Sequence, residues 1–134
     1  MANRQNGERT RVMIVEQGLD FGIKLADWLA THGYQPVLFR TVGAAIGELS
    51  DIRPQAIFIG LRPSEHEAPM DATEMLLLIQ TICSHAPVTT IADQTREDLT
   101  QVVLRQGVRR FLVKPVEFSQ IGGVLRSELS AATV

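Results

Sequence analysis

The most informative stretch of the chain is a short apolar run, Ala56 to Ile59, that ends at Gly60. The turn-forming pair Arg53-Pro54 precedes this run, and a polar loop begins at Arg62. Four residues are too few for a helix, and the lack of polar alternation predicts a strand buried on both faces. Such strands belong to parallel sheets covered by helices, where ligands bind at the carboxyl ends of the strands.

Similar apolar runs alternate along the chain with segments whose apolar residues have helical spacing. For example, Leu25, Trp28 and Leu29 predict a helix that Asp20 caps and Gly33 ends. The predicted strands are 11–16, 35–39, 56–60, 88–92 and 110–113. The predicted helices are 21–31, 42–50, 72–84, 96–106 and 118–131, with Asp20, Thr41, Asp71 and Thr95 as N-caps.

The alternation of strand and helix, repeated five times, predicts a parallel sheet with helices on both faces and right-handed crossovers. Pro36 lies near the start of the second strand, which suits an edge strand because proline lacks an N–H group. The expected fold class is therefore α/β, a flavodoxin-like, doubly wound, three-layer (βα)5 fold with strand order 2-1-3-4-5. Residues 1–10 are expected to form a disordered leader, and 11–134 a single domain.

Composition narrows the functional classes. The chain has 134 residues and a net charge of −2, which gives no general attraction to nucleic acid or to an anionic membrane. No apolar stretch approaches the length needed to span a membrane. Cys83 is alone, so an internal disulfide is impossible and a reducing, cytoplasmic location is expected. His32, His66 and His85 lack the spacing of metal ligands.

The first strand-to-helix turn, 16–20, lacks the glycine-rich fingerprint of a dinucleotide site, and the chain has no P-loop. The sequence from residue 11 to about 130 instead resembles the receiver domain of two-component response regulators. The segment 107–115, with Lys114-Pro115 after the fifth strand, supports this resemblance best. Further support comes from the strand 11–16, His32-Gly33-Tyr34, Pro54, Asp71-Ala72 and Pro87-Val88.

The resemblance implies a phosphorylation site at the carboxyl ends of the strands. In receiver domains, an acidic pair after strand one binds Mg²⁺, and an aspartate at the end of strand three accepts the phosphoryl group. A hydroxyl after strand four and a lysine after strand five contact the phosphoryl oxygens. A carboxylate nucleophile, a hard cation and a fixed ammonium are what acyl phosphate formation requires.

This chain departs from that pattern at most positions. The acidic pair corresponds to Glu16 and Gln17, so one carboxylate is replaced by a neutral amide. Gly60 stands at the phosphoacceptor position, and Ala92 stands at the hydroxyl position. Lys114 matches the family lysine, and we expect it to contact Glu16 because a partly buried ammonium needs an anion. Mg²⁺ binding, and any other cofactor, is not expected.

A second feature concerns binding of partners. Phe111 matches the switch aromatic of receivers but lacks a tyrosine hydroxyl. With Arg105, Arg109 and Arg110, it marks a possible interaction face formed by helix four, strand five and helix five. Alternatively, these arginines lie at a solvated corner between a helix and a strand and bind no partner.

The sequence therefore predicts a non-enzymatic, atypical receiver that acts in two-component-type signalling, independently of phosphorylation, through protein–protein interaction. The expected partner is a histidine kinase, an effector, another receiver or a second copy of the chain, and not nucleic acid or a membrane. One alternative is a module that binds a small ligand or anion in the vacated pocket. Another is a receiver phosphorylated at a non-standard carboxylate, such as Asp93 or a loop residue.

Overall fold

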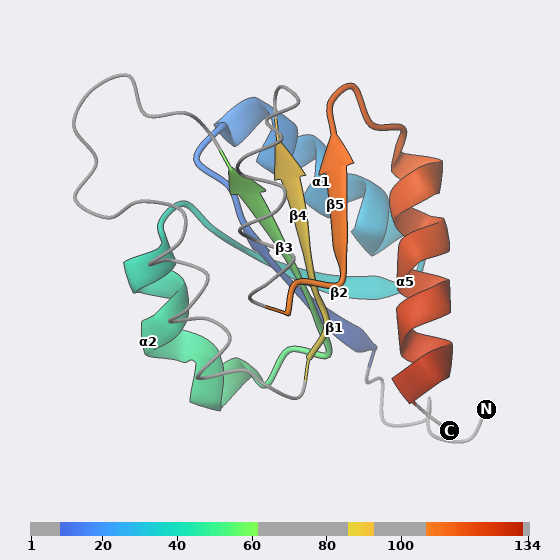
Figure 1. The fold of residues 1–134 in the computed structure, drawn as a ribbon. Helices are drawn as coiled ribbons and strands as arrows, with labels where there is room; N and C mark the ends of the chain where they lie inside the picture. Colours follow the sequence, from blue (N-terminus) through green and yellow to red (C-terminus); the bar gives the residue numbers. More distant parts are fainter. Residues whose placement is uncertain (1–8, 62–85, 93–106, 133–134) are drawn as a thin grey trace.

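The structure, a computed structural model, describes residues 9–61, 86–92 and 107–132 and contains a parallel sheet with helices against both faces (Figure 1). The predicted helices 72–84 and 96–106 lie outside these residues. The strands are β1 (Thr10–Val15), β2 (Tyr34–Phe39), β3 (Ala56–Leu61), β4 (Val88–Ala92) and β5 (Arg110–Val113). The described helices are α1 (Leu19–Thr31), α2 (Val42–Ile52) and α5 (Phe118–Ala132).

The sheet confirms the predicted topology. Its five strands are parallel and lie in the order β2-β1-β3-β4-β5. Pro36 is in β2, opposite Val12, and β2 is an edge strand as expected. β1 begins at Thr10, so the last residue of the predicted leader belongs to the sheet.

Strand β3 is buried on both faces, as its unbroken apolar run predicts. Ile57 and Ile59 pack with Ala45 and Leu49, which come from α2. Phe58 points the other way, into a second core. That core contains Leu25 and Leu29 of α1 and Ile121 and Leu125 of α5. In Figure 1 these two helices cover the face of the sheet opposite α2.

The ends of the helices show where local sequence signals succeed and fail. Thr41 caps α2 as predicted, since its Oγ1 accepts a hydrogen bond from Ala44 N at 3.1 Å. The N-cap of α1 is Gly18 and not Asp20, which lies within the first turn. The acidic side chain of Asp20 still interacts favourably there with the positive end of the helix dipole. Gly33 follows the end of α1 with φ 95°, a left-handed conformation that favours glycine.

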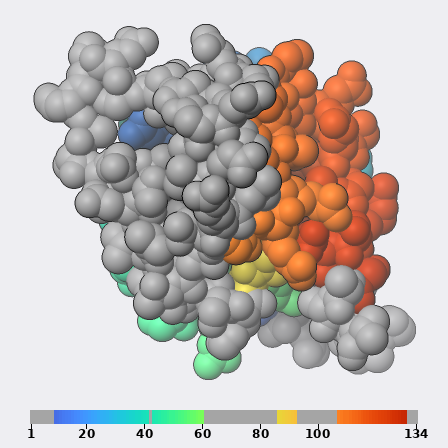
Figure 2. All heavy atoms as spheres, in the orientation of Figure 1, coloured from blue at the N-terminus to red at the C-terminus, as the bar shows by residue number. Residues whose placement is uncertain are grey.

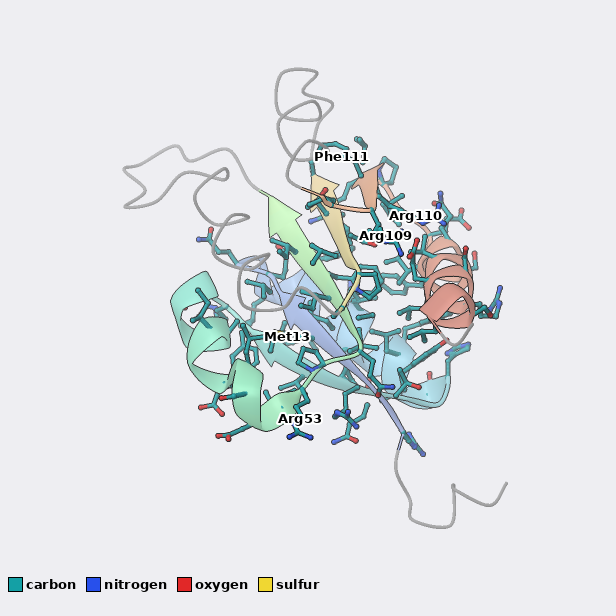
Figure 3. All side chains as sticks on the ribbon, turned by 60° about the horizontal axis from the view of Figure 1, so that its bottom comes forward. Met13, Arg53, Arg109, Arg110 and Phe111 are labelled. Atoms are coloured by element: carbon teal, nitrogen blue, oxygen red, sulfur yellow. The ribbon has the colours of Figure 1, made fainter. Side chains whose placement is uncertain are left out.

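At the amino end of β1, Arg11 supports the last turn of α2. Its Nε donates to Ile52 O at 2.8 Å and to Arg53 O at 2.9 Å. These carbonyls lack partners within the helix, and a cation is favourable at this end of a helix. Arg53, labelled in Figure 3, ends α2 in a left-handed conformation with φ 52°.

Helices α1 and α5 approach each other closely at Trp28. A Cβ atom built on Gly122 would lie 2.8 Å from Cη2 of Trp28, so a glycine is needed there for space. The ring of His32 stacks on the indole of Trp28, with the two ring centroids 3.8 Å apart. Within the described residues, no helix has the length and apolar character required to cross a membrane.

Candidate functional site at the carboxyl end of the sheet

The parallel sheet brings the predicted site residues to one edge. Glu16 directly follows β1, Gly60 lies near the end of β3, Ala92 ends β4, and Lys114 follows β5. Backbone hydrogen bonds fix this edge, because Lys114 N donates to Ala92 O at 2.8 Å and Glu16 N donates to Phe39 O at 2.9 Å. The expected grouping of these positions at the carboxyl ends of the strands is therefore present.

Glu16 is buried, with a relative exposure of 2%. Its Oε2 accepts a hydrogen bond from Gly18 N, the N-cap of α1, at 2.8 Å. The buried carboxylate thus lies at the amino end of a helix, where backbone amides and the helix dipole favour an anion. Gln17, the second position of the family's acidic pair, is exposed.

Gly60 and Glu16 share the same space. A Cβ atom built on Gly60 would overlap Oε1 of Glu16 and lie 2.8 Å from its Cδ. The backbone does not demand glycine here, because the described glycines with positive φ are Gly33 and Gly107. A side chain at position 60 would begin in the space that the carboxylate of Glu16 occupies, so any residue other than glycine requires this carboxylate to move.

Lys114 extends toward α1. Its Nζ lies 4.1 Å from the centroid of the Phe21 ring, which is a cation–π geometry. Glu16 is placed by its bond to Gly18 and Lys114 by this ring, so the direct contact expected between them stays a prediction.

Ala92 offers no polar group to this edge. It is 3% exposed and packs in the core on the α2 side of the sheet. Phe111 of β5 is partly buried against the same core (Figure 3). The two positions that the sequence resemblance assigns to the hydroxyl and to the switch aromatic are therefore apolar, and both contribute to packing.

Two arginines of the possible interaction face pair with an acidic residue of α5. Arg109 Nε lies 3.4 Å from Oε1 of Glu128, and Arg110 Nε lies 3.0 Å from Oε2. Arg110 also donates from Nη2 to Ser127 Oγ at 3.1 Å. Figure 3 shows both arginines beside α5, and Arg105 lies outside the described residues. Sequence reasoning missed Glu128, because its partners are 18 and 19 positions away and no local pattern links them.

The described residues at this edge do not fit a magnesium site of the receiver type. Mg²⁺ prefers several oxygen ligands, usually including carboxylates. Here the side chain of Glu16 is buried and bonded to Gly18, Gln17 is exposed, and Gly60 supplies no side-chain oxygen. Across residues 9–61, 86–92 and 107–132, no group of three His, Cys, Asp or Glu side chains could hold a metal ion.

The fold of this chain is similar to that of solved structures, although no protein-family model matches its sequence. No curated protein matches the sequence either. A CheY-like response regulator receiver domain from Methanospirillum hungatei JF-1 superposes with a TM-score of 0.84 at 14% identity, over 94% of this chain and 98% of that one.

Two further structures agree. The receiver domain of a modulated diguanylate cyclase from Desulfovibrio desulfuricans G20 has a TM-score of 0.81 at 20% identity, over 94% and 98% of the two chains. A two-component response regulator from Clostridium difficile has a TM-score of 0.81 at 19% identity, over 91% and 97%. The chain has the flavodoxin-like fold of response regulator receiver domains, which confirms the predicted resemblance at the level of the fold.

Proposed function

We propose that this chain is an atypical receiver module of two-component-type signalling that works without phosphorylation at the end of β3 and acts by binding another protein. The observation that carries the proposal is the pair formed by Gly60 and Glu16. Gly60, which the sequence resemblance assigns to the phosphoacceptor position, has no side chain, and the carboxylate of Glu16 fills the space beside it.

The chemistry of an acyl phosphate supports this proposal. Its formation needs an accessible carboxylate nucleophile and a cation that offsets the charge of two approaching anions. The carboxylate of Glu16 is buried and already accepts a hydrogen bond from Gly18. Lys114 alone cannot supply the missing carboxylate, the metal ligands and the hydroxyl. The proposal accordingly includes no catalytic activity and no cofactor.

We propose that the partner binds to a face that includes β5 and α5, both of which lie within the described residues. Figure 2 shows these two elements, in orange and red, forming a continuous surface. The side chains of Arg109 and Arg110 remain 55% and 41% exposed although they pair with Glu128. A histidine kinase, an effector, another receiver or a second copy of the chain would meet a surface whose arginines are already held in place.

The test is treatment of the purified protein with a small-molecule phosphodonor and Mg²⁺, followed by intact mass spectrometry. We expect no phosphoryl adduct, whereas a receiver domain that keeps the acidic pair and the aspartate should gain one under the same conditions. A stoichiometric adduct that is stable in acid and labile in base would overturn the proposal. Peptide mapping of such an adduct would then identify the carboxylate used, including Asp93 or a loop residue.

The ligand-binding alternative receives less support from the same geometry. The space beside Gly60 holds a carboxylate, whose charge disfavours a second anion there. A thermal-shift screen with inorganic phosphate, sulfate and nucleotides distinguishes the two functions. Stabilisation by an anion that is lost in Lys114→Ala would favour the ligand-binding module.

A further inference from the structure

The side chain of Glu16 lies between helix α1 and strand β3. Its Oε2 is bonded to Gly18 at the start of α1, and its Oε1 fills the space beside Gly60 of β3. On the helix side, a Cβ atom built on Gly22 would lie 3.4 Å from Cγ of Glu16 and 3.1 Å from Cδ1 of Leu38. One side chain that follows β1 therefore packs against glycines from both α1 and β3.

A side chain at position 60 is unfavourable because it would force the carboxylate of Glu16 out of its present position. The carboxylate is the end of a flexible side chain, so a new atom at position 60 could displace it by rotation. A displacement that carries Oε2 away from Gly18 N would break their hydrogen bond and leave a buried charge in need of a new partner. Leaving a buried charged group unsatisfied costs more than the hydrogen bond itself contributes.

We infer that Glu16 is a built-in substitute for the missing acceptor side chain, and that it locks the β1–α1 turn and the end of β3 in a single arrangement. The carboxylate that a receiver would present from β3 is supplied here from the end of β1. Unlike an aspartate at the end of β3, it is tied to the helix backbone. The loss of the acceptor is thus enforced by two residues together, and substitution of Gly60 alone cannot reverse it.

The inference rests on the proposed function for its biological meaning, since a locked site suits a module whose output does not depend on phosphorylation. Two physical consequences do not depend on the function. Gly60 and Glu16 are energetically coupled, and the carboxylate of Glu16 holds the Gly18 amide in a hydrogen bond. Both statements can be measured on the protein without a partner or a phosphodonor.

The first experiment is a double-mutant cycle of Gly60→Ala and Glu16→Ala, measured by urea denaturation. In the native background we expect Gly60→Ala to lower the folding equilibrium constant by roughly tenfold or more, because the Cβ atom displaces the carboxylate. In the Glu16→Ala background the same change should have little effect. Gly47→Ala is the matched control, because a Cβ atom at this helical position meets nothing within 4 Å and alanine favours helix.

If Gly60→Ala fails to fold while the double variant folds, the inference is supported. If Gly60→Ala has the same effect in both backgrounds, or is tolerated as well as Gly47→Ala, the inference is overturned. Failure of the double variant to fold while Glu16→Ala folds would also overturn it, because the cost at position 60 would then come from another neighbour.

The second experiment measures hydrogen exchange at the Gly18 amide. Exchange should become faster in Glu16→Ala and return toward the native rate in Glu16→Gln, whose amide oxygen can accept the same hydrogen bond. Unchanged exchange in Glu16→Ala would refute the role of Glu16 in the turn. A phosphoryl adduct at another carboxylate would refute the proposed function but leave the coupling intact, so the two failures are distinguishable.

Discussion

The two ends of the sheet hold their buried or half-buried charges in different ways. At the amino end, charged side chains from separate elements pair with one another, as Arg109 and Arg110 do with Glu128 of α5. At the carboxyl end, the charge of Glu16 is held by the backbone amide of Gly18 and by the space that Gly60 leaves. The contacts at the amino end thus join a helix to the sheet, whereas those at the carboxyl end join the β1–α1 turn to the end of β3.

This contrast predicts that the carboxyl end is the less tolerant of a new charge. Gly60→Asp should lower the free energy of unfolding by about 2–4 kcal/mol, because the new side chain overlaps Glu16 and places a second carboxylate beside the first. Urea denaturation measures the loss, with Gly47→Asp on the exposed face of α2 as control. Phosphorylation should not appear in this variant, and efficient phosphorylation would show that the site is less closed than its geometry implies.

The amino end should depend on the charge of Glu128. Glu128→Gln keeps the shape of the side chain but removes the charge that pairs with the two arginines, and should cost about 1–2 kcal/mol of stability. The exposure of both arginines keeps the effect below that of a fully buried ion pair. Thermal unfolding compared with Glu48→Gln, an exposed glutamate on α2, checks this value. Equal stability of the two variants would mean that α5 is held by apolar packing alone.

Arg11 provides a smaller test of the same end. Arg11→Ala removes a cation from the terminal carbonyls of α2 and should cost about 1 kcal/mol. Arg40→Ala, which changes an exposed arginine, is the control. Hydrogen exchange should rise in the last turn of α2, and an increase spread evenly over the sheet would argue for a different role.

The smallest change in stability is expected for an exposed ion pair on α1. Lys24 Nζ lies 3.4 Å from Oδ2 of Asp20, and both side chains are mostly exposed. Lys24→Gln should change stability by less than about 0.5 kcal/mol, and added salt should reduce even this effect. A larger change would indicate that Lys24 contributes through contacts other than this pair.

Much of the fold could be predicted because local patterns and burial agree. The unbroken run from Ala56 to Ile59 signals a strand with two apolar faces, and its residues are buried in two separate cores. Pro36 marks an edge strand because it cannot donate a ladder hydrogen bond. Thr41 caps α2 through a bond that its sequence position alone suggests.

The site was only partly predictable, since its decisive contacts join distant residues. The bare end of β3 is visible in the sequence, but the side chain that fills it comes from Glu16, 44 positions earlier. The prediction that Asp20 caps α1 was wrong. The helix begins at Leu19 with Gly18 as its N-cap, so Asp20 lies inside the first turn. In the sequence, nothing distinguishes Glu128 from an exposed glutamate, because its pairing with Arg109 and Arg110 depends on the packing of α5 beside β5.

The close approach of α5 to Trp28 also gives the protein an optical reporter. Trp28 is the chain's single tryptophan, and it lies against Gly122 and Phe118 of α5 and against His32, which directly follows α1. Its fluorescence therefore comes from the junction of two helices and from no other place in the molecule. Separation of α1 from α5 will therefore change the emission of Trp28 without any added label, and replacement of the stacked His32 distinguishes its contribution from that of α5.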